Sequence, residues 1–152
     1  MNTQQPTKPN LIFSIFSNKC PRCRRGDLFT QHNPYKLKGL MRMHEHCRVC
    51  GQTTDMEPGF YYGTSYVSYA LGITISVATF IAWWILIGFS FQDNRFFWWM
   101  GINAAILVFL QPPLMRLSRT IWINFFIHYS SHWNEGDVVK AERVNDALKN
   151  AW

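Results

Sequence analysis

Residues Val67 to Phe91 read VSYALGITISVATFIAWWILIGFSF, a continuous run without a charged side chain or a histidine. The hydrocarbon core of a bilayer is about 30 Å thick and needs about 20 apolar helical residues, so this run can cross it with some tilt. A buried helix of a soluble protein would normally carry a polar stripe, whereas only scattered Ser and Thr interrupt this run. The stretch therefore predicts a transmembrane helix.

A second uncharged run follows almost at once, from Phe96 to Met115, and is also long enough to span a bilayer. Only residues 92–95 (QDNR) separate the two runs, so the helices must lie antiparallel. Tyrosines before the first run and the Phe-Phe-Trp-Trp start of the second occupy the positions of interfacial aromatic belts. We expect a two-helix transmembrane hairpin within residues 58–115, with spans at about 67–91 and 96–115.

Lysine and arginine are distributed unevenly about this hairpin. Nine of the 15 precede the first span, five follow the second, and Arg95 alone lies in the connection. Cytoplasmic loops are enriched in Lys and Arg, so we expect both termini in the cytoplasm. Residues 1–10 lack an apolar signal core; we expect them to be disordered and the first span to act as an uncleaved insertion signal.

The only four cysteines of the chain form two CxxC pairs ahead of the first span: Cys20, Cys23, Cys47 and Cys50. A single segment, from Arg24 to His46, separates the pairs, so closing one short loop brings four sulfurs to one point. Four thiolates suit tetrahedral zinc. Residues 11–57 are rich in Pro, Gly and Asn and poor in apolar residues, which predicts a small β zinc ribbon that needs its metal to fold.

Other uses of the thiols stay open. Iron fits the same four thiolates, because rubredoxin-type electron carriers also use paired CxxC turns. Disulfides are disfavoured in a reducing cytoplasm, and neither pair has the helix-start setting of a redox-active CxxC. His44 and His46, with Met41 and Met43, could suggest copper, but a closed four-thiolate site needs no fifth ligand, so we interpret them as surface residues.

The chain changes character after the second span. Pro112 and Pro113 are expected to bend the helix there, and Arg116 and Arg119 are placed to reach lipid headgroups. Over residues 116–133 a polar row at four-residue steps alternates with apolar rows. This pattern is typical of an amphipathic helix lying in the membrane interface.

The motif CPRCxxGxLF from Cys20 to Phe29, followed by CxxCG from Cys47 to Gly51 and a two-span hairpin, resembles family 983 of the bacterial domains of unknown function, in its Bacteroidetes-type version. The resemblance covers roughly residues 10–130. It implies a zinc-ribbon protein of the bacterial inner membrane without an established activity. Relatives encoded near genes for haem–copper oxidase assembly suggest a part in respiratory-complex biogenesis.

No charged residue lies in either span, and no phosphate loop, paired-carboxylate site or Ser/His/Asp arrangement can be assembled. The sequence thus favours a binding or scaffolding module over an enzyme, with the bilayer and other membrane proteins as partners. A thiol- or iron-based redox protein is the alternative. Nucleic acid is not expected, because no aromatic residues interleave the arginines of the first pair. Residues 134–152 are expected to form a cytoplasmic tail.

Overall fold

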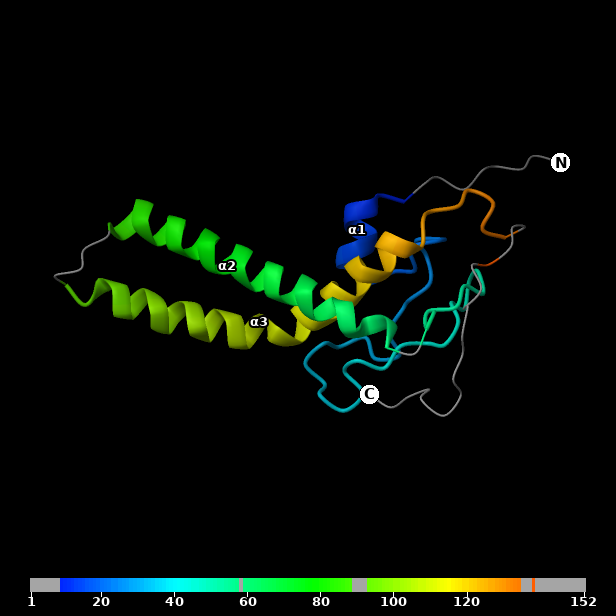
Figure 1. Ribbon diagram of the computed structural model, residues 1–152, viewed down its shortest axis with the longest axis horizontal. Helices are drawn as coiled ribbons and strands as arrows, with labels where there is room; N and C mark the ends of the chain where they lie inside the picture. The colour runs from blue at the N-terminus through cyan, green and yellow to red at the C-terminus, as the bar shows by residue number, and fades with distance from the viewer. Residues whose placement is uncertain (1–8, 58, 89–92, 135–137, 139–152) are drawn as a thin grey trace.

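The computed structural model describes residues 9–57, 59–88, 93–134 and 138. Its elements in chain order are α1 (Leu11–Phe16), the 3₁₀ helix η1 (Phe60–Gly63), α2 (Thr64–Ile87) and α3 (Arg95–Phe126). The expected disordered terminus and cytoplasmic tail lie almost wholly outside the described residues. Figure 1 shows a long hairpin of α2 and α3 and, at one end, a group of loops with α1. We call this second part, residues 9–57 and 127–134, the cysteine head.

Hydrogen bonds between small polar side chains join α2 to α3, which lie side by side along the hairpin (Figure 1). Near the head, Ser68 Oγ and Ser118 Oγ are 2.8 Å apart. Farther along, Asn103 accepts a hydrogen bond from Thr79 Oγ1 (3.0 Å) and donates one to Ser76 Oγ (3.2 Å). Bonds of this kind between membrane helices contribute about 0.6 kcal/mol each. They fix the register of the two antiparallel helices.

Both helices of the hairpin are long and apolar enough to cross a membrane. The helical segment Phe60–Ile87 has 28 residues, and the mean hydropathy of its most apolar stretch is 2.1. The helix α3 has 32 residues, and the corresponding mean hydropathy is 1.3. A core helix of a soluble protein would bury such a stretch, but here the buried share is 0% in the first helix and 6% in the second. The two expected spans are thus present as helices, and the last residues of the first, 89–91, lie outside the described part of the chain.

The cysteine head contains little regular structure. Residues 11–16 form the short helix α1, where the sequence favoured turns and strands. Elsewhere in the described part of the head, segments pair only through three isolated antiparallel bridges: Lys19 with Asp27, Phe29 with Met43, and His46 with Thr53. The bridges pair the segments that would be strands in a β zinc ribbon, but the pairing is too short to form a strand in the described residues.

The core of the head is shared with the end of α3. Leu28 is fully buried and Phe29 is 6% exposed, and both belong to one cluster with Ile123 and Ile127. Leu37, another apolar residue of the head, lies outside this core and is 76% exposed. Because Ile123 belongs to α3, the hairpin completes the apolar core, and the head is not an independent domain.

The helix α3 differs from the expectation of a bend followed by a separate interfacial helix over residues 116–133. It continues through Pro112 and Pro113 to Phe126, although Figure 1 shows its axis changing direction in this region. The physical reason lies beyond the prolines, where α3 is held by tertiary contacts. Trp122 Nε1 donates to Phe60 O (2.8 Å) and Thr120 Oγ1 donates to Asn18 Oδ1 (2.8 Å).

Two arginines of α3 tie the head to the hairpin instead of reaching lipid headgroups. Arg116 is 2% exposed, and its guanidinium lies 5.0 Å from the ring centre of Phe29. Arg119 donates to Met41 O at 3.0 Å. The guanidinium of Arg116 donates to four backbone carbonyls of one loop: Leu40 (3.0 Å), Gln31 (2.9 Å), His32 (3.3 Å) and Asn33 (3.2 Å). The planar fork of five N–H donors makes this set of contacts specific to arginine.

We predict that Arg116→Met releases the loop of residues 31–41 from α3. Hydrogen bonds from a charged donor contribute about 1.5–3 kcal/mol each, so the loss should be about 3 kcal/mol or more. Hydrogen–deuterium exchange should rise at least about tenfold at the amide of Thr30, which donates to Arg42 O across the base of the loop, and at the amide of Arg42, which donates to Gly39 O.

The matched control is Arg42→Met, which removes an exposed arginine at the base of the same loop. It should leave exchange nearly unchanged, and Arg116→Lys should fall between the two because a point charge cannot serve four carbonyls. Equal exchange in Arg116→Met and Arg42→Met would contradict the assignment of Arg116 as the clamp.

Candidate metal centre

The first cysteine pair sits on a tight turn closed by the backbone. The N–H of Arg24 donates to Cys20 O at 2.7 Å, and the N–H of Cys20 donates to Gly26 O at 2.8 Å. Arg24 adopts φ 55°, in the left-handed region that costs a residue with a Cβ about 1–2 kcal/mol. The nearest glycine, Gly26, comes two positions after Arg24. Arg24 itself therefore adopts the left-handed conformation that a glycine usually provides in such a turn.

The second pair repeats the construction. The N–H of Gly51 donates to Cys47 O at 2.9 Å, and the N–H of Cys47 donates to Gln52 O at 2.8 Å. Gly51, at φ 70°, occupies the place that Arg24 has in the first turn. The two turns therefore present their cysteines in equivalent ways, as the paired CxxC spacing predicts.

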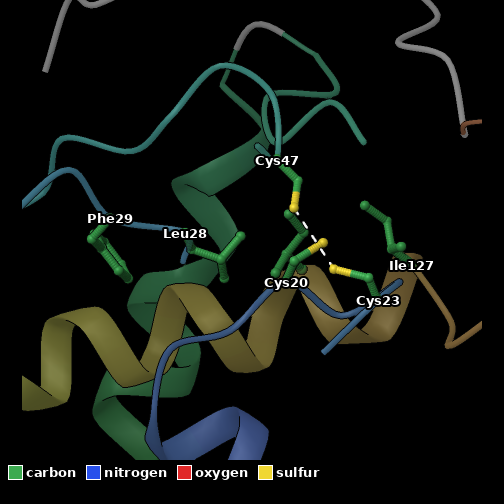
Figure 2. Packing of buried hydrophobic residues seen from close by; sticks show 7 residues of the cluster. Cys20, Cys23, Leu28, Phe29, Cys47 and Ile127 are labelled. Carbon is green, nitrogen blue, oxygen red and sulfur yellow. Dashed lines mark hydrogen bonds between the residues drawn. The ribbon is translucent and has the colours of Figure 1, made fainter. Parts of the chain in front are cut away.

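The four sulfurs converge on one point. Cys20 Sγ lies 3.7 Å from Cys50 Sγ, Cys23 Sγ lies 3.7 Å from Cys47 Sγ, and all four lie within 4.8 Å of one another. Figure 2 shows three of these side chains turned toward each other above the end of α3. A tetrahedral zinc with bonds of about 2.3 Å has sulfur–sulfur edges of about 3.8 Å, whereas a disulfide needs about 2.05 Å. The donors fit one tetrahedral metal ion and no disulfide.

Backbone N–H groups stabilise negative charge on every sulfur. The N–H of Cys23 donates to the sulfur of Cys20, and that of Gly26 donates to the sulfur of Cys23. In the second turn the N–H of Cys50 donates to the sulfur of Cys47, and that of Gln52 donates to the sulfur of Cys50. Each bond favours the thiolate, the form that binds metal. The turns thus supply both the ligands and the hydrogen bonds that orient them.

Hydrogen bonds among the sulfurs separate their pKa values. The bond between Cys20 and Cys23 raises the pKa of Cys20 and lowers that of Cys23, while the bond with Cys20 lowers the pKa of Cys47 to about 6. For Cys50 the bond with Cys20 lowers the pKa, but bonds with Cys23 and Cys47 and burial outweigh it and raise the pKa. Two of the thiols, Cys20 and Cys50, thus have raised pKa values, and Cys23 and Cys47 have lowered ones.

Arginines of the first turn lie close to the cluster. Arg22 is 3% exposed, and its Nη1 donates to Cys50 O at 3.5 Å. Arg24 donates to Pro9 O at 2.9 Å, and Arg25 is an exposed neighbour. A divalent ion with four thiolates has a net charge of −2, so a buried arginine beside it offsets part of that charge.

The segment after α3 covers the first turn, a role that the sequence did not indicate. Ile127 is 1% exposed in the cysteine core, and the N–H of Ser130 donates to Arg22 O at 3.1 Å. The guanidinium carbon of Arg24 lies 4.7 Å from the ring centre of Tyr129, and that of Arg25 lies 5.7 Å from Trp133. Of these covering residues, only Trp133 lies beyond the stretch that the family resemblance covers.

Histidines near the second pair do not join the cluster. In the described part of the chain, the one group of metal-ligating side chains that converge consists of the four cysteines. His46 is exposed, and burial lowers the pKa of His44. The four thiols therefore form the candidate metal centre without a histidine ligand.

Gly26 also belongs to the centre, although the sequence showed it only as one position of the CPRCxxGxLF motif. A Cβ at this position would clash with Cys47 Sγ and lie 3.3 Å from Val49 Cγ2. The backbone of the first turn thus packs directly against a sulfur of the second. This contact joins segments that lie far apart in the sequence, so no local pattern could indicate it.

Comparisons with known proteins identify no family: no protein-family model matches the chain, and no curated protein or solved structure shows a significant match.

We predict that Gly26→Ala weakens metal binding at least about tenfold, because the new methyl group displaces Cys47 Sγ. Titration with zinc against a chelator of known affinity measures the change. The control is Gly51→Ala, where a Cβ meets nothing within 4 Å but φ is +70°. It should cost about 1 kcal/mol of folding free energy and change the zinc affinity much less. Equal affinities for the two variants would contradict the contact.

Zinc binding at pH 7 is expected to release about two protons per ion, those held by Cys20 and Cys50. Because protons compete for these raised-pKa thiols, the apparent affinity should fall as the pH falls, by about 100-fold per pH unit near neutrality. Calorimetry in buffers of different ionisation enthalpy counts the protons. Release of four protons, or of none, would contradict the pKa order.

Proposed function

We propose that this protein is an integral protein of the bacterial inner membrane whose cysteine head binds one zinc ion and serves as a binding or scaffolding module at the cytoplasmic surface. The observation that carries this proposal is the convergence of four sulfurs on a head clamped to an apolar hairpin. Four protein ligands close a tetrahedral zinc site and leave no position for a substrate. The metal then has a structural role.

A rigid attachment supports the scaffolding role. Arg116 and Arg119 hold one side of the head, and Trp122 holds η1 at the start of the first helix. A flexible linker would let a metal domain sample many orientations, whereas these contacts fix its orientation relative to the hairpin. A surface held in one orientation binds a membrane partner at a lower entropic cost.

The distribution of charge supports the cytoplasmic orientation. Both chain segments of the head, before α2 and after α3, lie at the same end of the hairpin (Figure 1). Nine of the 15 Lys and Arg residues precede the first span and five follow the second, with Arg95 near the tip. This asymmetry is typical of segments that stay in the cytoplasm.

Membership in family 983 of the bacterial domains of unknown function belongs to the same proposal. It is supported by the CPRCxxGxLF motif and the CxxCG motif, whose residues all lie in or beside the two cysteine turns. With that membership, the head presents a surface to a respiratory complex or to the proteins that assemble it.

An iron-based electron carrier is the second candidate. Three of the cysteines are buried but Cys50 is partly exposed, so one sulfur could lie near a redox partner. The N–H donors to the sulfurs would tune the potential of a bound iron. Four-thiolate ferric iron absorbs visible light and zinc does not, so colour separates the two functions.

The test is purification of the full chain from its native membranes in a mild detergent. We expect retention in the membrane after an alkaline wash, about one zinc per chain without visible colour, and loss of zinc in Cys20→Ser. Membrane proteins that co-purify should depend on the metal, being lost with Cys20→Ser and kept with Ser131→Ala, an exposed residue of the head.

Protease added to sealed vesicles reports the orientation. The head should be cleaved in inverted vesicles and protected in right-side-out spheroplasts. Extraction by alkaline wash would refute the membrane assignment, and bound iron would favour the electron carrier. Turnover of a substrate that Cys20→Ser abolishes without unfolding the head would refute the scaffolding role.

A further inference from the structure

One loop of the head exposes apolar and basic side chains together. In the segment Asn33–Leu40, Leu37 is 76% exposed and Tyr35 is 46% exposed. Lys36 and Lys38, on either side of Leu37, are exposed as well. Contacts with α3 hold this loop in place. We call residues 33–40 the basic loop.

The basic loop is fixed at its base and through the side chain of Tyr35. Arg116 binds the carbonyls of Asn33 and Leu40, the two ends of the loop. Within the loop, the ring of Tyr35 packs against Phe109 of α3, with 5.3 Å between the ring centres. The loop therefore extends from the level of Arg116 along α3 toward the hairpin tip.

The position of Phe109 along α3 gives the level of the loop relative to a bilayer around the hairpin. Arg116 lies two helical turns beyond Phe109 on α3, which is about 10 Å at about 1.5 Å per residue. From Phe96, at the far end of α3, to Arg116 is about 30 Å, the thickness of the hydrocarbon core. If the hairpin crosses a bilayer, Arg116 marks its boundary and Tyr35 lies beyond it, on the lipid side.

An independent marker places the boundary at the same level. Ser68 bonds to Ser118, so this part of α2 lies beside Arg116. Here Tyr66 and Tyr69 are 78% and 71% exposed, as expected of rings at a membrane interface. Apolar faces of interfacial segments enter a bilayer by about 5–10 Å, which agrees with the reach of the basic loop.

We propose that the basic loop inserts into the leaflet beside the hairpin and binds anionic phospholipid, with Leu37 among the acyl chains and Lys36 and Lys38 on headgroup phosphates. This inference rests on the proposed membrane location. Burial of Leu37 removes its exposed surface from water, and each lysine near an anionic surface adds about fivefold in affinity.

The helix α1 gives the head a second exposed apolar patch. Ile12, Phe13 and Phe16 are 71%, 70% and 69% exposed. In Figure 1, α1 and the loop that contains residues 33–40 lie on opposite sides of the hairpin at a similar distance from its tip. Contacts on two sides would seat the head on the membrane surface.

The test places a fluorine label in the basic loop. The full chain carrying Leu37→Trp is labelled with 5-fluorotryptophan and reconstituted in nanodiscs of equal parts phosphatidylcholine and phosphatidylglycerol. The new ¹⁹F resonance should be broadened by lipid with a nitroxide near the headgroup and protected from a soluble gadolinium chelate. The matched control is Arg48→Trp, at an exposed position on the second cysteine turn, which should show the opposite pattern.

Two native tryptophans show whether a negative result refutes the membrane location or only the lipid contact of the basic loop. Trp83 and Trp84, in the apolar part of α2, should be broadened by nitroxide at the end of the acyl chain. If they are not, the membrane location itself fails. If they are, but the Leu37→Trp resonance is broadened only by gadolinium, the membrane location stands and the lipid contact of the basic loop is refuted.

A second measurement tests the charge. Nitroxide-labelled phosphatidylglycerol should broaden the Leu37→Trp resonance more than the same amount of labelled phosphatidylcholine. Adding Lys36→Gln and Lys38→Gln should remove that difference, while Lys149→Gln, outside the head, should keep it. Equal broadening by the two lipids with both lysines present would refute the anionic preference.

Discussion

A buried guanidinium at the boundary of an apolar hairpin is the interaction on which the arrangement of the head depends. Arg116 is almost without contact with solvent, and burying an unpaired charge is far more costly than burying a neutral group. The charge is accommodated because four carbonyls of one loop surround it. Since the arginine needs the loop and the loop's carbonyls need the arginine, the head and the hairpin cannot separate without leaving buried polar groups unpaired.

This constraint explains why α3 stays helical where its own sequence would interrupt a helix. Two consecutive prolines remove backbone donors, yet the helix continues beyond Pro113 as far as Phe126. That last part of the helix contributes Arg116, Arg119 and Trp122 to the junction and a buried isoleucine to the core of the head. Tertiary contacts thus stabilise a helical segment that its local sequence would interrupt. The segment that follows then closes over the first cysteine turn.

The sequence was sufficient for the parts that local patterns encode. Apolar runs long enough to span a bilayer indicated two helices, and the CxxC spacing indicated four converging thiols. It was insufficient where the determining partner lies far along the chain. Arg116 bonds to residues 76 to 85 positions away, and Gly26 is required by a sulfur of the other turn. An arginine after an apolar run also fits a lipid headgroup, so only the folded chain distinguishes the two uses.

The metal centre and the basic loop belong to one structural unit. Each side of the loop's base leads directly to a cysteine turn: the N–H of Thr30 donates to Arg42 O, and the N–H of His44 donates to Leu28 O. Leu28 in turn lies in the core with Cys20. A structural metal stabilises the turns that carry its ligands and the segments that continue from them, because these turns fold and bind the ion in one step. A metal ion bound by the cysteines would therefore stabilise the same backbone to which Arg116 donates its hydrogen bonds.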